Sequence, residues 1–392
     1  MVSTLLIKSI VALLGIGTMT FAFLFFKTKR KEIALLAVSI AIAIIVSEFS
    51  LRIFLPQISN HVRMFEPDPT LGWKFIANGK WKIVYPGGIR NVIEINSMGF
   101  RDQSPPSDRK RKLLVLGDSF VSNISVKDHE VFTEVMEDQL KNYDVLNFGV
   151  VGYGQVQEYL LLQKWIKEIK PDVVLVIVYF GNDFIDNIGA YWGISRPYAS
   201  LEGEDSVLVI HPESHPQSKN QQKGSSSILS KSHLNTLINR SLNKIFQEYD
   251  SSLAPPEFYS CQWPTPKSED LMFRIMGELL LKIANLGKEN DVPVVFALAP
   301  SLVQIKDELW ESFLKKNIIY KKKFLRSLPN DRLMEFGKRN DLLMLDLFPQ
   351  LHQESKTNVD VYHPAEHHWT KEGNRVVANA LIDYLESKSL ID

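Results

Sequence analysis

Four segments of the sequence combine small, polar and basic residues in a way that suits acyl-group chemistry. They are Gly117-Asp118-Ser119, the glycines around Gly152, Gly181-Asn182-Asp183, and the pair His367-His368. A serine hydroxyl becomes a nucleophile when a base removes its proton, and histidine is the usual base near neutral pH. The sequence therefore predicts Ser119 as a nucleophile and His368 as its base.

The same segments also offer hydrogen-bond donors for a developing negative charge. The tetrahedral intermediate of acyl transfer carries an oxyanion, which needs donors that are already in place. We expect these to be the backbone N–H groups of Ser119 and Gly152 and the side-chain amide of Asn182. Each motif alone is also typical of a strand-end turn or a helix cap. Their order along the chain favours a shared site.

A parallel sheet would bring these segments together. Short apolar runs predict strands at 112–117, 144–147, 172–180, 292–298 and 342–347, and helical spacing predicts helices at 131–141, 156–170, 271–290, 331–339 and 371–385. This alternation indicates an α/β fold, a three-layer α/β/α sandwich with a mostly parallel sheet. In such sheets the active site lies beyond the carboxyl ends of the strands, where the first three segments fall.

From about Asn96 to the C-terminus, the chain resembles the SGNH/GDSL hydrolases. That family is named for Ser, Gly, Asn and His in four sequence blocks, which correspond here to Ser119, Gly152, Asn182 and His368. The stretch Asn-Ser-Met-Gly-Phe-Arg-Asp before the serine block is similar to that of membrane-anchored members, a subgroup that also resembles the alginate O-acetyltransferases. The resemblance implies a flavodoxin-like sandwich, ester hydrolysis or acyl transfer, and no metal.

The histidine block departs from the family pattern. The family places an aspartate three residues before the histidine to orient the imidazole, and this chain has Ala365 there. Glu366 and Asp360 are the nearest carboxylates, and either could accept the Nδ1–H of His368. The tryptophan that follows matches the His-Trp pair of the family and favours His368 over His367 as the base.

Composition excludes several other classes of function. Lys+Arg and Asp+Glu are both 45, and a chain without basic bias is not typical of nucleic-acid binders. The single cysteine, Cys261, cannot form an intrachain disulfide. His363, His367 and His368 lack an accompanying set of spaced acidic or cysteine ligands. We therefore expect no metal, no other cofactor and no nucleic-acid partner.

The N-terminal residues 1–56 predict a transmembrane hairpin with helices at about 5–26 and 33–55. The first run has 22 residues with one charge, and the second reaches spanning length by including Glu48 and Arg52, which can pair one turn apart. The basic loop between the runs indicates the cytoplasmic side, so the chain after residue 56 would lie outside the cytoplasm. The alternative is a signal peptide followed by a buried helix.

The remaining chain is interpreted as an irregular connecting segment (57–110) and a hydrolase-like domain (111–392). The domain carries an insertion at about 188–262, whose place after the Asn182 block makes it a candidate lid. Within it, the polar stretch at 212–227 predicts a loop, and the segment 228–247 predicts a helix.

These features predict a membrane-tethered serine esterase whose catalytic domain lies on the non-cytoplasmic side. It would remove an acyl group, acetyl being the first choice, from a cell-envelope glycan or lipid through an acyl-Ser119 intermediate. An O-acyltransferase that modifies a polysaccharide would share the first half-reaction. A non-catalytic binding protein on the same fold is the third interpretation, which Ala365 keeps open.

Overall fold

The computed structural model describes residues 29–54, 64–84, 90–102, 111–189, 196–203, 206–212, 232–238, 260–263, 265, 267–317, 323–357, 359–364 and 366–392. The chain divides into two compact units. The first comprises Met1–Ile58 with Ser227–Asn243, and the second comprises Ser59–Ser226 with Lys244–Asp392.

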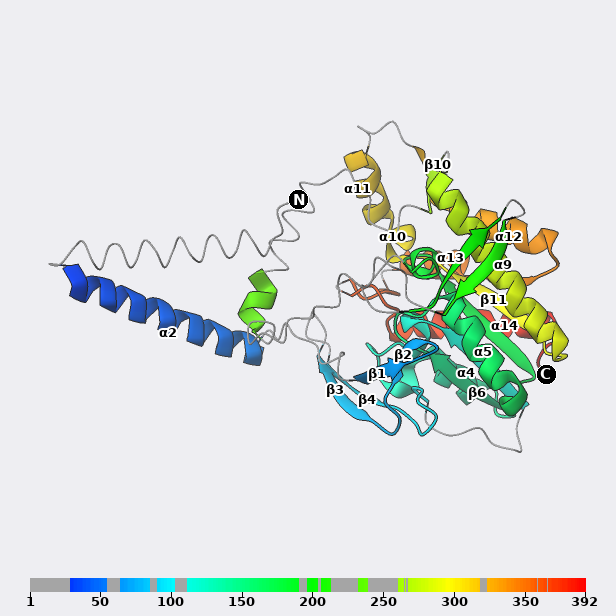
Figure 1. Cartoon of the computed structure of the whole chain (residues 1–392), viewed down its shortest axis with the longest axis horizontal. Helices are drawn as coiled ribbons and strands as arrows, with labels where there is room; N and C mark the ends of the chain where they lie inside the picture. Colours follow the sequence, from blue (N-terminus) through cyan, green and yellow to red (C-terminus); the bar gives the residue numbers. More distant parts are fainter. Residues whose placement is uncertain are drawn as a thin grey trace. The chain divides into compact units, whose positions relative to one another are not determined.

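The second unit is built on a five-stranded sheet in the order β13-β11-β7-β5-β6, in which every pairing is parallel (Figure 1). Its strands are β5 (Arg111–Gly117), β6 (Tyr143–Gly149), β7 (Val173–Tyr179), β11 (Val294–Ala299) and β13 (Leu343–Asp346). The five strands predicted from the sequence are therefore confirmed, with their ends shifted by at most two residues.

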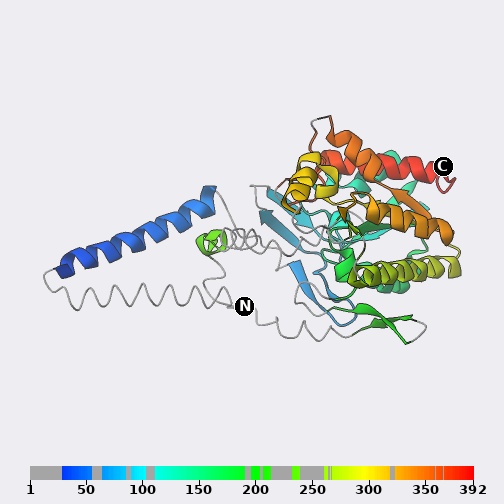
Figure 2. The same cartoon turned by 90° about the horizontal axis from the view of Figure 1, so that it is seen from above.

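Helices cover both faces of this sheet. One face carries α5 (Gln155–Ile169), α9 (Lys267–Glu289) and α12 (Leu328–Arg339); the other carries α4 (Phe132–Gln139), α10 (Leu302–Ile305), α13 (Phe348–Ser355) and α14 (Lys371–Ser387). Figure 2 shows α14, in red, and α9, in yellow-green, on opposite sides of the sheet. The predicted three-layer sandwich is thus observed. Helices α10, α13 and α11 (Asp307–Asn317) were not predicted.

The alternation of apolar side chains along each strand builds two cores. In β7, Val174, Val176 and Val178 face α5 and α9, whereas the intervening Val173, Leu175 and Ile177 face α4 and α14. All six are at most 1% exposed. Burying one such side chain contributes about 1.5–3 kcal/mol. A strand apolar on both faces is stable only between two helical layers, which is why this strand is central.

The connecting segment is more regular than expected. It contains two antiparallel pairs, β1 (Phe65–Asp68) with β2 (Gly72–Phe75) and β3 (Lys80–Val84) with β4 (Arg90–Glu94). Side chains two residues apart share one face of a strand. Trp73 and Phe75 lie two residues apart on β2, and both are buried. Ile93 of β4 and Ile95, just after it, are buried as well. These short strands therefore extend the core on the α5 side of the sheet instead of forming an irregular lead-in.

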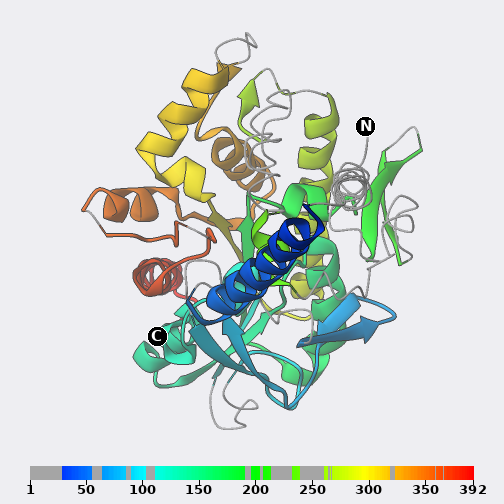
Figure 3. The same ribbon diagram turned by 90° about the vertical axis from the view of Figure 1, so that its left-hand side faces the viewer.

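The described part of the insertion includes a hairpin of β8 (Tyr198–Glu202) and β9 (Val207–His211), drawn in green at the edge of the domain in Figure 3. Leu201, Leu208 and Ile210 of this hairpin pack against α9 side chains. A second small pair joins β10 (Gln262–Trp263) to β12 (Lys323–Phe324), next to the buried thiol of Cys261.

The first unit contains the helix α2 (Arg30–Phe54). Its span Lys31–Phe54 has a mean hydropathy of 2.4 and contains no buried residue, and it is the one helix in the described part of the chain that is long and apolar enough to cross a membrane. At about 1.5 Å per residue it reaches about 36 Å, against a bilayer core of about 30 Å. The other predicted helix, at about 5–26, lies outside the described residues, so the hairpin stays a prediction.

Glu48 of α2 makes the ion pair that the sequence predicts, with Arg52 Nε at 2.9 Å. It also accepts hydrogen bonds from the Ser232 hydroxyl and from the backbone N–H groups of His233 and Leu234, at 2.9–3.0 Å. Residues 233–238 form a short helix, and Glu48 caps its first turn. This is the described part of the helix expected at 228–247.

The second unit contains a buried acid, Glu158, that lowers the stability of the fold by an amount that depends on pH. Glu158 of α5 is fully buried and pairs with no cation in the described part of the chain. Burial, with the nearby charge of Asp118, raises the pKa of Glu158 well above its usual value. The folded protein therefore holds a proton that the unfolded chain releases above about pH 4.3.

We predict that Glu158→Gln stabilises the protein, and that the gain grows with pH. Folding takes up a proton at Glu158, so the native chain loses up to about 1.4 kcal/mol of stability per pH unit above the unfolded-state pKa, and the amide lacks this slope. The melting temperatures of variant and parent, measured from pH 5 to pH 8, should diverge as pH rises. Glu168→Gln, an exposed site on the same helix, is the control. A gain of equal size at every pH would contradict the prediction.

Candidate active site

Ser119 lies at a sharp turn from a strand into a helix. Strand β5 ends at Gly117, and Ser119 is the first residue of the short helix α3 (Ser119–Ser122). The carboxylate of Asp118 caps this helix by accepting the Phe120 N–H at 2.7 Å. A Cβ on Gly149, at the end of β6, would lie 2.4 Å from the backbone nitrogen of Ser122. Glycine there lets α3 pack onto the strand ends, and this fixes Ser119 at the carboxyl edge of the sheet.

His368 is presented by a tight loop just before α14. Tyr362 and Trp369 form an antiparallel bridge across the loop, and the His363 N–H donates to the His368 carbonyl at 2.8 Å. Trp369 is fully buried and lies edge-on to Phe120, with ring centroids 4.8 Å apart. Because Phe120 follows the serine directly, this contact packs the histidine loop against the serine helix.

Ser119, His368 and Glu366 form a continuous hydrogen-bonded relay. His368 Nε2 lies 2.8 Å from Ser119 Oγ, and His368 Nδ1 lies 2.6 Å from Glu366 Oε2. The Glu366 side chain is 5% exposed and that of His368 is 22% exposed. The imidazole thus has a carboxylate on one nitrogen and a hydroxyl on the other, which is the arrangement of a nucleophile, a base and an orienting group.

Electrostatic interactions raise the pKa of His368 and lower the pKa of Glu366. Burial alone would lower the pKa of His368, but the hydrogen bond and charge of Glu366, with the charge of Asp118, outweigh burial and raise it. Burial would raise the pKa of Glu366, and the contact with His368 outweighs that effect and lowers it. Both shifts favour a carboxylate–imidazolium pair, the state that forms when His368 takes a proton.

The three expected oxyanion donors follow adjacent strands. Ser119 follows β5, Gly152 follows β6, and Asn182 follows β7 at the N-cap of α6 (Asp183–Asp186), and β5 lies between the other two strands in the sheet. Within the described residues, the backbone N–H groups of Ser119 and Gly152 donate to no protein acceptor. Gly152 has φ +79°, a left-handed conformation that favours glycine. These donors are available to a ligand.

The other candidates from the sequence lie away from the relay. Asp360 is 63% exposed and pairs with Lys306 Nζ at 2.8 Å instead of with His368. His367 occupies the left-handed turn position of the loop, at φ +68°, and its N–H donates to the His363 carbonyl. Ala365 lies outside the described residues. Of the two carboxylates that the sequence left open, the structure brings Glu366 to the imidazole.

Sequence reasoning missed two buried charged residues behind the oxyanion donors, Asp186 and Arg196. Asp186 accepts a hydrogen bond from the Asn182 amide, and Arg196 pairs with Asp186 at 2.8 Å. The four-residue spacing of Asn182 and Asp186 could have signalled the first contact. Arg196 stands in the insertion, where no periodic pattern indicates which side chains turn inward.

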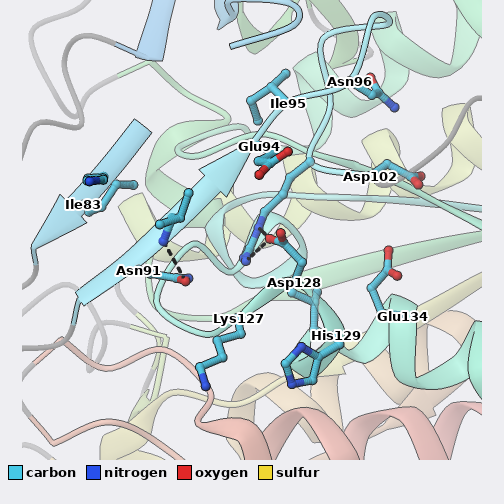
Figure 4. Close-up of a pocket in the computed structure, with 14 residues that line it drawn as sticks. Ile83, Asn91, Glu94, Ile95, Asn96, Asp102, Lys127, Asp128, His129 and Glu134 are labelled. Carbon is cyan, nitrogen blue, oxygen red and sulfur yellow. Dashed lines mark hydrogen bonds and ion pairs between the residues drawn. The ribbon is translucent and has the colours of Figure 1, made fainter. Parts of the chain in front are cut away.

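A separate cavity of about 930 Å³ lies between the β3–β4 pair and the segment that leads into α4 (Figure 4). Ten of its fourteen lining residues are polar or charged, among them Asn91, Glu94, Lys127 and Glu134. None of Ser119, His368 and Glu366 lines it. In the described part of the chain, no group of three or more His, Cys, Asp or Glu side chains is arranged to hold a metal ion.

No protein-family model and no curated protein matches the sequence. The chain is similar to several solved structures. A lipolytic protein of the G-D-S-L family from Veillonella parvula is 12% identical, with a TM-score of 0.37, over 70% of this chain and 97% of that one. An acetylxylan esterase from Geobacillus stearothermophilus is 10% identical, with a TM-score of 0.36, over 72% and 96%. An esterase from a Pseudoalteromonas species is 9% identical, with a TM-score of 0.36, over 71% and 98%. Similarity this distant carries no argument about activity, which must come from the site itself.

We predict that Glu366→Gln lowers the pKa of His368 and reduces turnover. Glu366 favours the imidazolium, so its removal should move the acidic limb of the pH–rate profile to lower pH, where His368 becomes neutral. Loss of the orienting carboxylate should also lower kcat by roughly 10²- to 10⁴-fold. The measurement is the pH dependence of kcat/KM toward a chromogenic ester.

Asp360→Asn is the matched control, because Asp360 is the other carboxylate that the sequence offered to His368. Its profile should coincide with that of the parent. If the acidic limb moves in Asp360→Asn and stays in place in Glu366→Gln, the assignment of the orienting group is wrong.

Proposed function

We propose that this protein is a serine esterase of the SGNH/GDSL type, tethered to a membrane by its N-terminal segment. The observation that carries the proposal is the Glu366–His368–Ser119 relay, at 2.6 Å and 2.8 Å, placed at the carboxyl edge of a parallel sheet. The sequence resemblance agrees with it, since the same residues are the ones that match the family blocks. Ala365 stands where the family has an aspartate. This departure does not favour a non-catalytic binding protein, because Glu366 brings a carboxylate to His368 Nδ1.

The geometry supports a two-step mechanism. His368 Nε2 takes the proton of Ser119 as Oγ attacks the ester carbonyl carbon, and the carbonyl oxygen becomes an oxyanion near the N–H groups of Ser119 and Gly152 and the Asn182 amide. The intermediate collapses, and His368 returns the proton to the departing alcohol oxygen. Water then attacks acyl-Ser119 in the same way, which releases a carboxylic acid and restores the serine hydroxyl.

The substrate class that we propose is an acetyl ester on a cell-envelope glycan or lipid. The resemblance to membrane-anchored members and the apolar helix α2 support this choice, because a tethered domain meets substrates of the envelope. A polysaccharide O-acyltransferase would use the same first step and replace water with a sugar hydroxyl. The two are separated by adding an oligosaccharide acceptor to the assay and measuring acetylated sugar against free acetate.

We predict that Ser119→Ala and His368→Ala each lower the hydrolysis of p-nitrophenyl acetate by at least about 10³-fold. The reason is that neither the nucleophile nor its base has a substitute within the relay. His367→Asn is the control, because asparagine tolerates the left-handed backbone of that position. It should retain activity. An inactive parent, or equal rates in parent, Ser119→Ala and His368→Ala, would contradict the esterase proposal.

We further predict that the catalytic domain lies on the non-cytoplasmic side. The basic residues around the start of α2 favour a cytoplasmic position for that end of the helix. The C-terminal end of α2 would then lie outside the cytoplasm. An alkaline phosphatase fused to the C-terminus should be active, because that reporter folds only outside the cytoplasm, and a fluorescent protein at the same position should be dark. The reverse pattern would show that the proposed topology is wrong.

A further inference from the structure

A buried ion pair supports two of the three oxyanion donors from behind. Arg196 is 1% exposed and Asp186 is fully buried, and Arg196 Nη1 lies 2.8 Å from Asp186 Oδ1. Burial raises the pKa of Asp186 to about 6, against the opposing charge of Arg196. The charge of Arg196 favours the ionised form of this carboxyl, and the two side chains form a buried ion pair. Removing one partner of such a pair strongly destabilises the folded protein, because the other charge is left buried without a partner.

Each end of the pair contacts a different donor residue. Arg196 Nη2 donates to the Gly152 carbonyl at 2.8 Å, and Nη1 donates to the Asp186 carbonyl at 3.3 Å. The second carboxylate oxygen of Asp186 accepts from the Asn182 amide. One guanidinium thus links the loop after β6 to the loop after β7. The planar fork of arginine suits this double role, whereas the point charge of lysine does not.

Trp73 of the connecting segment completes the support of Gly152. Its ring lies 4.9 Å from the Arg196 guanidinium, and its indole N–H donates to the Val151 carbonyl at 3.0 Å. The Tyr153 hydroxyl donates to the Trp73 carbonyl. A Cβ at Gly152 would stand 3.3 Å from the Trp73 ring and 3.8 Å from Arg196. The residues on both sides of Gly152 are therefore fixed, and Arg196 holds Gly152 itself.

We propose that Arg196 is a positioning residue that holds Gly152 and Asn182 in the geometry of an oxyanion hole, and thereby sets the rate of acyl transfer at Ser119. The inference rests on the proposed ester chemistry and extends it, because Arg196 belongs to the insertion and not to the four sequence blocks. Donors help a transition state only when they are already oriented, and a small displacement costs much of their effect. The insertion is thus part of the catalytic machinery and not only a candidate lid.

The test is Arg196→Lys in the full-length protein, with every rate expressed per active site. Labelling to completion with a fluorophosphonate counts the sites that retain a reactive Ser119. We expect kcat per labelled site for p-nitrophenyl acetate to fall by roughly 10- to 100-fold, with KM within about twofold of the parent. Binding of a trifluoromethyl ketone, which forms a tetrahedral oxyanion on the serine, should weaken by the same factor as kcat/KM.

Asp186→Asn provides a second variant in case Arg196→Lys fails to fold. It keeps an oxygen for the Asn182 amide but loses the charge that fixes Arg196, so kcat should fall less than in Arg196→Lys. The double variant should be no worse than Arg196→Lys alone, because both changes break one linkage. Arg332→Lys is the matched control, since Arg332 also pairs with an aspartate, Asp270, and lies over the ring of Phe273.

Three results would overturn the proposal. A normal kcat per labelled site, with fewer sites labelled, would mean that Arg196 only stabilises the fold. An equal loss in Arg332→Lys would mean that the effect is not specific to the donors. A parent that neither hydrolyses the ester nor reacts with the fluorophosphonate would remove the proposed function, and this inference with it. The first two results would leave the esterase proposal standing.

Discussion

The hydrogen bond between Ser119 and His368 joins residues 249 positions apart, and the architecture can be understood as the means of forming it. Ser119 follows the second-to-last strand of the sheet order, β5, whereas His368 precedes the last helix, α14. Closing a loop of this length costs conformational entropy that local contacts do not repay. The compensating free energy comes from the core on the α4 and α14 face, where Trp369 packs on Phe120 next to Ser119 and His368. The side chains that pack this core therefore also hold Ser119 and His368 next to each other.

The sequence predicted the parts of the site that local patterns encode. Buried strands are marked by apolar runs, and the residues after three of them, Ser119, Gly152 and Asn182, could be placed because parallel strands share one carboxyl edge. The choice between Glu366 and Asp360 could not be made in the same way. Glu366 reaches His368 because the loop turns back on itself, with a left-handed residue between the two side chains. Such a turn depends on tertiary contacts that no spacing rule contains.

The elements that the sequence missed are short or lack periodicity. The β1–β4 strands have four or five residues each, too few for a clear alternation, and their burial depends on the α5 face that they cover. Arg196 is a more instructive case. A charged side chain is normally solvated, and the burial of Arg196 follows from its contacts with Asp186, the Gly152 carbonyl and the Trp73 ring. The information that places it inside is therefore distributed over three distant segments.

The buried pair explains how the carboxyl edge of the sheet can be rich in acids and still keep a defined geometry. Asp118, Glu158, Asp183 and Asp186 are all at most 1% exposed near the strand ends, and of the described basic side chains only Arg196 pairs with one of them at similar burial. An ion pair removed from water rarely adds stability, and an apolar replacement of the same shape often serves stability better. What an apolar replacement cannot do is bond a carbonyl and an amide at fixed angles. Burying Arg196 and Asp186 is unfavourable, and we interpret this unfavourable free energy as the cost of preorganisation. In the proposed reaction, Gly152 and Asn182 would stabilise the oxyanion because they are already oriented and need not move.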